Sequence, residues 1–262
     1  MPKGPRSRLW LAVSVAALVV AVCLYPGSPE QPTHKGKLLD EWLEQYRTNI
    51  MSVGDGDKTW RRDQASQAIR ELGTNAIPHL LGLLRETDSK WTEWYREVEV
   101  RFFRSHRTPA WSRNWDAVNG FRILGSEASQ AVPALVEIYD QNRSGMSRSC
   151  AASALGGIGP TASAALPSLL TGATNFSGQA RIESILALGE IHAAPSTVVP
   201  ILISSLGDSN RGVRFSAVRA LGQFGSNAQP ALPKLQELVE KKDRSTWKAA
   251  EQAIKQITPN GF

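Results

Sequence analysis

The sequence has very little cysteine and histidine. Its 262 residues include two cysteines, Cys23 and Cys150, and four histidines. Cys23 lies in an apolar segment and Cys150 in a predicted helix far along the chain, so we expect no disulfide between them. The histidines are scattered, and no group of His, Cys, Asp and Glu has the spacing of zinc ligands. We therefore expect packing alone to hold the fold together, without cofactor or metal.

The motifs of common enzyme classes are also missing. The chain contains no GxxxxGK[ST], GxGxxG, GxSxG or HExxH pattern. Its net charge is +6, of which Lys3, Arg6 and Arg8 supply half, so the remaining chain carries only +3. Such a diffuse excess mainly favours solubility, whereas a duplex binder needs a stripe of Lys and Arg on one surface. The sequence thus disfavours nucleic acid as a partner.

A long uncharged run opens the chain. Residues 9–25 read LWLAVSVAALVVAVCLY and follow the basic residues 1–8. As a helix this run spans roughly 25 Å, which is close to the thickness of a bilayer core. We expect an uncleaved transmembrane anchor whose basic end stays in the cytoplasm. Residues 26–37 then form a Pro- and Gly-rich linker to an exported domain, 38–262. The alternatives are a cleaved signal peptide, which would leave a secreted protein, and a buried core helix.

A period of about 33 residues, a length typical of helical repeats, runs through the second half of the chain. Pro167, Pro200 and Pro233 are each 33 residues apart, and Pro133 lies 34 residues before Pro167. Several other residue types keep the same step: Leu155, Leu188 and Leu221; Gly156, Gly189 and Gly222; Ala154, Ala187, Ala220 and Ala253; Arg148, Arg181 and Arg214. Agreement of so many residue types on one period indicates a structural repeat.

Each repeat unit has the pattern of two helices. The first is rich in Ala and Leu, as in 213–222, and its apolar positions follow a helical stripe. A Gly turn such as Gly225 ends it, and a second helix begins with Pro in its first turn. Neither helix can bury its stripe alone, so pairs must stack. Less regular units occupy 65–84 and 117–139, and 244–257 looks like a final first helix.

The pattern D-x5-R-x2-A-x2-ALG in residues 208–222, followed by a turn and A-x-PxL, resembles the HEAT repeat, in the short bacterial form also called the phycobilisome-lyase HEAT-like repeat. The resemblance covers about residues 60–257. It implies an all-α, right-handed α-solenoid of about five HEAT-like helix pairs that binds other proteins. It also implies a structural hydrogen-bond ladder, whose members would be Asn142, Arg148, Asn175, Arg181, Asp208 and Arg214.

An insertion at about residues 85–116 interrupts the period. Its candidate partner-binding residues are Trp91, Trp94, Arg101, Arg104, Arg107, Trp111, Arg113 and Trp115. Trp and Arg dominate interface hot spots, and insertions in solenoids often lie on one binding face. The alternative is a locally packed helix with aromatic residues at helical spacing, and both readings can hold together.

The function follows only from what such a fold usually does. We expect a non-enzymatic protein-interaction scaffold, anchored in a membrane, whose partner the sequence does not identify. The second helices, which start at the prolines, are expected to line the concave face. The alternative is a HEAT-like enzyme, such as an alkylated-base DNA glycosylase or a chromophore lyase.

Overall fold

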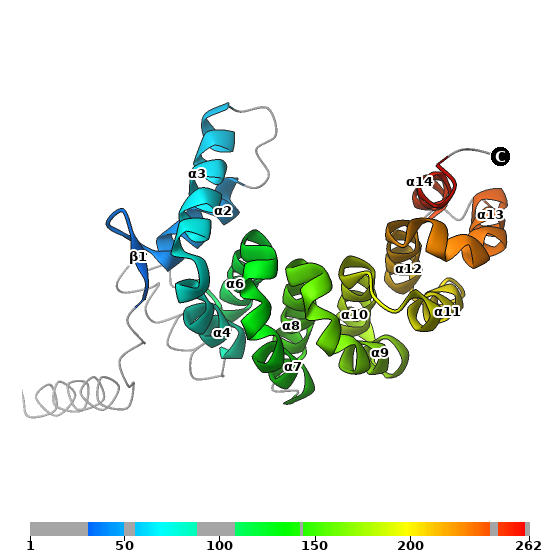
Figure 1. Ribbon diagram of the computed structural model, residues 1–262, viewed down its shortest axis with the longest axis horizontal. Helices are drawn as coiled ribbons and strands as arrows, with labels where there is room; N and C mark the ends of the chain where they lie inside the picture. The colour runs from blue at the N-terminus through cyan, green and yellow to red at the C-terminus, as the bar shows by residue number, and fades with distance from the viewer. Residues whose placement is uncertain (1–30, 50–55, 88–107, 142–143, 242–245, 260–262) are drawn as a thin grey trace, which may run out of the picture.

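Pairs of helices follow one another along an arc in the computed structural model of the protein (Figure 1). The structure describes residues 31–49, 56–87, 108–141, 144–241 and 246–259. The expected anchor at 9–25 lies outside these ranges. Within them, no helix is both long enough and apolar enough to cross a membrane.

The helices form two rows. The first row holds the first helix of each pair: α3 (Gly56–Leu72), α6 (Ala110–Leu124), α8 (Gly145–Ile158), α10 (Gly178–Ile191), α12 (Arg211–Gln223) and the terminal α14 (Trp247–Ile257). The second row holds the second helices: α4 (Ile77–Arg85), α7 (Val132–Gln141), α9 (Leu166–Asn175), α11 (Pro195–Ser205) and α13 (Leu232–Glu240). Over the described ranges this makes five pairs and a final helix, as the repeat predicts.

Short 3₁₀ turns join the two helices of most pairs. They are η1 (Gly73–Ala76), η2 (Gly125–Ala131), η3 (Gly159–Ala165) and η4 (Gly225–Ala231). Each begins at a glycine with positive φ, a conformation that side chains disfavour. In the remaining pair His192 takes this place with φ of 53°, and its ring stacks on Phe224 with centroids 4.8 Å apart.

The first row, not the second, lines the concave side of the arc. Figure 1 shows α3, α6, α8, α10, α12 and α14 along the inner edge, with the second helices outside them. Our expectation that the helices starting at the prolines face inward is therefore wrong. The reason is packing distance: a Cβ added at Gly189 would lie 2.7 Å from Cα of Ala220, and one at Gly156 would lie 3.0 Å from Cα of Ala187. Helices in backbone contact occupy less length, so their row takes the inside of the curve.

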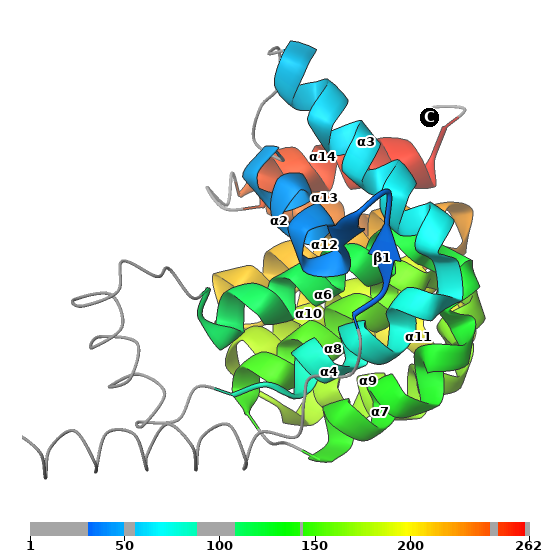
Figure 2. The same cartoon turned by 90° about the vertical axis from the view of Figure 1, so that its left-hand side faces the viewer.

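A small N-terminal unit covers one end of the arc (Figure 2). It consists of a hairpin of β1 (Thr33–His34) and β2 (Lys37–Leu38), which are antiparallel, and the helix α2 (Leu39–Asn49). Trp42 is buried, and its indole Nε1 donates to the carbonyl of His34 at 3.2 Å. Leu39 and Leu43 complete an apolar face that joins the core of the helix pairs.

The expected insertion overlaps the second helix pair. Residues 110–116, which we placed in the insertion, form the first turns of α6. Residues 88–107, which hold most of the expected insertion, lie outside the described residues.

Candidate binding surface

The inner face of the arc is built from the exposed positions of the first-row helices. In α12 the buried stripe includes Ala217 and Leu221. Phe215 and Arg219 lie on the opposite side of this helix, because about 3.6 residues make one turn. The positions that repeat Phe215 and Arg219 one unit earlier are Ile182 and Leu186 of α10. The inner face therefore carries aligned columns of side chains.

Apolar side chains are exposed on the inner-row helices. Phe215 is 40% exposed and Met146, at the start of α8, is 38% exposed. Ile182 is partly buried, and the space above Gly212 receives its side chain: a Cβ added to Gly212 would lie 2.6 Å from Cδ1 of Ile182. The side chain of Ile182 thus packs against Gly212 of the next helix, whereas Phe215 remains partly exposed to solvent.

Polar contacts of one arginine join three inner-row helices, α6, α8 and α10, and we call this group the clamp. Arg122 of α6 reaches across α8 to the carboxylate of Glu190 in α10, and its Nη2 also donates to the hydroxyl of Ser153 at 3.3 Å. Gly157 makes this crossing possible, because a Cβ there would lie 2.4 Å from Cγ of Arg122. Glu183 is buried beneath, 6% exposed, and burial raises its pKa although Gln179 and Ser153 donate to its carboxyl group.

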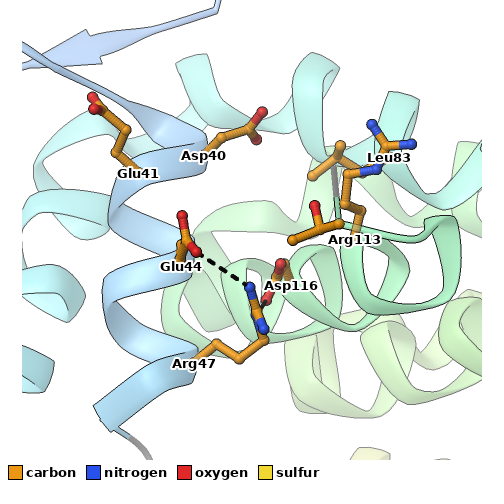
Figure 3. A pocket seen from close by; sticks show the side chains of 8 residues that line it. Asp40, Glu41, Glu44, Arg47, Leu83, Arg113 and Asp116 are labelled. Carbon is orange, nitrogen blue, oxygen red and sulfur yellow. Dashed lines mark ion pairs between the residues drawn. The ribbon is translucent and has the colours of Figure 1, made fainter. Parts of the chain in front are cut away.

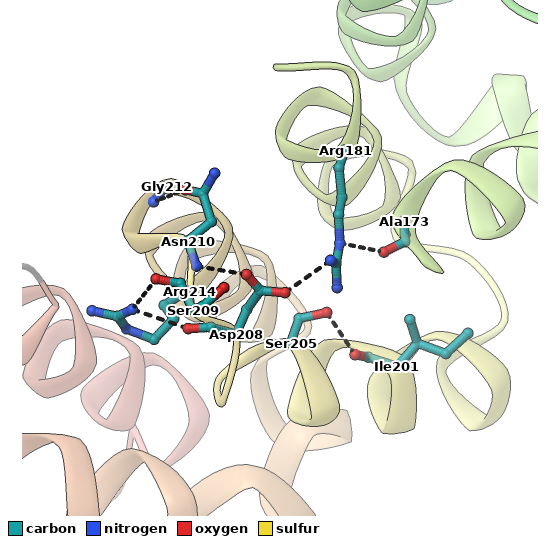
Figure 4. A network of polar contacts seen from close by, with 9 residues as sticks. All are labelled: Ala173, Arg181, Ile201, Ser205, Asp208, Ser209, Asn210, Gly212 and Arg214. Carbon is teal, nitrogen blue, oxygen red and sulfur yellow. Dashed lines mark hydrogen bonds and ion pairs between the residues drawn. The ribbon is translucent and has the colours of Figure 1, made fainter. Parts of the chain in front are cut away.

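The predicted arginine ladder joins consecutive pairs through helix ends (Figure 4). Arg181 Nε donates to the carbonyl of Ala173 at the end of α9, at 2.9 Å, and its Nη1 lies 2.8 Å from a carboxylate oxygen of Asp208. Arg214 Nη1 donates to the carbonyl of Asp208 at 3.0 Å. These guanidinium groups bind carbonyls that a helix end leaves without internal donors.

Arg148 repeats this arrangement with one change. Its Nε donates to the carbonyl of Tyr139 in α7 at 3.0 Å. The position that corresponds to Asp208 is Asn175, which is exposed, and the guanidinium instead lies 4.2 Å from the ring centroid of Phe176. Asn142, the remaining predicted member, lies outside the described residues.

A polar pocket lies where α2 meets the first two helix pairs (Figure 3). It has about 110 Å³ of space and is lined by Asp40, Glu41, Glu44, Arg47, Leu83, Thr108, Arg113 and Asp116. The Nε of Arg47 lies 3.0 Å from Oδ1 of the buried Asp116, which fixes α2 to α6. Burial raises the pKa of Asp116 to about 6, even though the charge of Arg47 opposes the shift.

The neighbouring Asp40 shifts in the other direction. Its Oδ1 lies 2.7 Å from Nε2 of His79, and Gln31 donates to its Oδ2 at 2.8 Å. Burial raises the pKa of Asp40, but these contacts outweigh that effect and lower it. His79 itself is buried against Asp40.

The predicted partner-binding residues separate into two groups. Trp91, Trp94, Arg101, Arg104 and Arg107 lie outside the described residues. The others belong to α6: Trp111 is 55% exposed, Trp115 is half-buried, and Arg113 pairs with Glu86 at 2.5 Å. Sequence reasoning did not select Phe215 or the clamp of Arg122 and Glu190, since it assigned the first helices to the wrong face.

Comparison with family models identifies helical repeats in this chain. Residues 166–255 match the family model of HEAT repeats. Among solved structures, an engineered protein is 18% identical, with a TM-score of 0.44 over 85% of this chain and 98% of the other. Human deoxyhypusine hydroxylase in complex with glycerol is also 18% identical, with a TM-score of 0.40 over 85% of this chain and 97% of that one. No curated protein matches the sequence. Residues 166–255 therefore carry HEAT repeats, and the paired helices of this region agree with that match.

Proposed function

We propose that this chain is a non-enzymatic scaffold that binds another protein on the inner face of its arc. HEAT repeats commonly mediate protein interactions. The observation that carries the proposal is the exposed apolar and charged side chains on the inner row, above all Phe215. These side chains stand on helices in backbone contact, so the surface is formed before a partner binds and little ordering is needed on binding.

The proposal includes attachment to a bacterial membrane through residues 9–25, with the helix pairs on the extracytoplasmic side as a right-handed superhelix. Support comes from the sequence alone: three cations, Lys3, Arg6 and Arg8, precede this uncharged run. Alkaline extraction of membranes should leave the full chain in the pellet, and a protease added from outside should digest the helix pairs. Recovery of the chain in the cytosol would contradict this topology.

Crosslinking in intact membranes tests the scaffold. A lysine-reactive crosslinker, followed by mass spectrometry, should join a reproducible protein partner to Lys248 and Lys255 of the inner-row helix α14. Crosslinks to Lys234 of the outer-row helix α13 and to Lys241, which caps its C-terminal end, serve as the internal comparison. A partner joined mainly through the outer lysines would move the binding surface, and the absence of any reproducible protein partner would overturn the scaffold.

A further inference from the structure

The C-terminal half of the inner face is basic around one exposed aromatic ring. The helix α12 contains Arg211, Arg214 and Arg219 and no acidic residue. Arg211 and Arg219 are exposed and stand four positions before and after Phe215, so all three lie on one stripe of the helix. Arg214 lies off this stripe and donates to the carbonyls of Asp208 and Ser209.

Among the described residues, no acid pairs with the arginines at the two ends of this stripe. In the described part of the chain, neither Arg211 nor Arg219 makes an ion pair, while Arg122, Arg181 and Arg113 all do. The next inner helix adds Lys248, which occupies the column of Phe215 one unit later. Of the exposed or partly exposed acids on the neighbouring inner helices, Glu190 of α10 is already held by Arg122, and Glu251 lies on α14 between Lys248 and Lys255. An exposed Phe between two unpaired arginines combines residue types that are enriched at protein–protein interfaces.

We propose that Arg211, Phe215 and Arg219 form a docking site for an extended acidic segment of a partner protein, with an apolar side chain between two carboxylates. This proposal rests on the scaffold function and specifies the chemistry of its partner. The charge of the stripe selects carboxylates, and the ring of Phe215, with Ile182 at the corresponding position of α10, provides the apolar contact.

The spacing of the arginines sets the spacing of the acids. Arg211 and Arg219 stand two helical turns apart, which corresponds to about 12 Å. An extended chain advances about 3.3 Å per residue, so it covers this length in about four residues. The matching core is therefore acid, any residue, apolar residue, any residue, acid. A nucleic acid fits less well, because the stripe offers only two unpaired cations around an apolar centre.

Binding of short labelled peptides to the full chain tests the proposal. The probe is a short fluorescein-labelled peptide with the core Glu-Thr-Leu-Thr-Glu, followed by fluorescence anisotropy. Peptides with the cores Lys-Thr-Leu-Thr-Lys and Glu-Thr-Ser-Thr-Glu are the controls. We expect the first peptide to bind about tenfold or more tightly than either control, with an affinity that falls as salt rises.

A charge exchange distinguishes the site from a general effect of charge or unfolding. In the variant Arg211→Glu with Arg219→Glu, the preference should reverse toward the lysine peptide, a gain that an unfolded variant does not produce. The control variant, Arg70→Glu with Arg85→Glu, makes the same change in charge on α3 and α4 and should keep the original preference. Phe215→Ser should weaken the leucine peptide and leave the serine peptide unchanged.

Several results would overturn the proposal. Equal binding of the acidic and basic peptides, or no reversal in the exchanged variant, would show that the stripe does not select acids. Tighter binding of a short single-stranded oligonucleotide, lost in the exchanged variant and unaffected by Phe215→Ser, would assign the stripe to nucleic acid. If the membrane-crosslinked partner stays bound to the exchanged variant, the scaffold stands and the docking site is wrong, whereas a wild-type chain without any protein partner rejects the scaffold itself.

Discussion

Arg122 and Glu190 are 68 residues apart in sequence, yet both guanidinium Nη atoms lie 3.0 Å from the Glu190 carboxylate. The pair spans α8 through the gap above Gly157 and ties three inner-row helices together. Since the Arg122 side chain is 40% exposed, solvent screens much of this attraction. Its structural effect is to fix three successive repeats relative to one another.

A double-mutant cycle should measure this clamp. Arg122→Gln and Glu190→Gln are each expected to lower the free energy of unfolding, and the double variant should lose less than their sum. We expect a coupling of about 0.5–1 kcal/mol, the usual size for a partly exposed pair. Urea unfolding at low and high salt checks this, with the coupling reduced at high salt. Strict additivity at low salt would show that the contact contributes nothing to stability.

The close approach of the inner helices should make Gly189 intolerant of side chains. Gly189→Val would place its Cβ 2.7 Å from Cα of Ala220, which is backbone and cannot rotate away. We expect a loss of roughly 1–3 kcal/mol or more in the free energy of unfolding, from overpacking. The matched control is Gly82→Ala in α4, where nothing lies within 4 Å of the added Cβ. The control should be neutral or slightly stabilising, and a similar loss in both variants would contradict the packing argument.

Removal of the buried carboxylate at Asp116 should change the pH dependence of stability. Its pKa is about 6 in the folded chain, against an ordinary 3.8, so the folded state binds this proton more tightly than the unfolded state. Between about pH 4 and 6 this group therefore makes the free energy of unfolding fall as pH rises. Asp116→Asn does not titrate, and relative to the wild type it should gain up to about 3 kcal/mol between pH 4 and pH 7.

Urea unfolding of both proteins across this pH range measures the difference. Subtraction removes the contributions of Asp40, Glu44 and other groups near the pocket, as long as they titrate alike in the two proteins. A difference that stays constant with pH would show that the carboxyl group of Asp116 keeps an ordinary pKa.

The thiol of Cys150 should be unreactive while the chain is folded. Cys150 is fully buried in α8, and burial, followed by the charge of Glu183, raises its pKa to about 12. At pH 8 iodoacetamide should leave Cys150 unmodified for hours and alkylate it rapidly in urea, because the thiolate is the reactive species. Peptide mapping by mass spectrometry separates it from Cys23. Fast modification of Cys150 in the folded chain would mean that this part of α8 opens readily.

The contact between Arg181 and Asp208 should couple neighbouring repeats. Asp208→Ala removes the partner of Arg181 and the acceptor for the backbone N–H of Asn210, which lies 2.7 Å from Oδ1. We expect a loss of about 1–3 kcal/mol. Asp208→Asn keeps an acceptor oxygen and should lose less. The comparison uses thermal unfolding of both variants, and equal losses would assign the effect to the charge of Asp208 rather than to its contact with the backbone of Asn210.

The sequence by itself determined the helix pairs, their period and their turns. These features depend on neighbours within one or two helical turns: the stripe around Leu221, the proline that opens α13, and the glycine at 225 whose positive φ ends α12. Such short-range patterns are visible in the chain because hydrogen bonds and side-chain stripes repeat every few residues. The arginines that recur once in each unit were visible for the same reason.

Only the tertiary structure decided which row of helices faces inward and which distant residues meet. The distance between α10 and α12 depends on Gly189 lying against Ala220, and that contact places the first helices on the concave side. The pairs Arg122–Glu190 and Arg47–Asp116 join helices from separate units, so no local pattern predicts them. The sequence places Phe215 between Arg211 and Arg219 on one side of α12. Only the packing of whole helices decides that this side faces the inside of the arc.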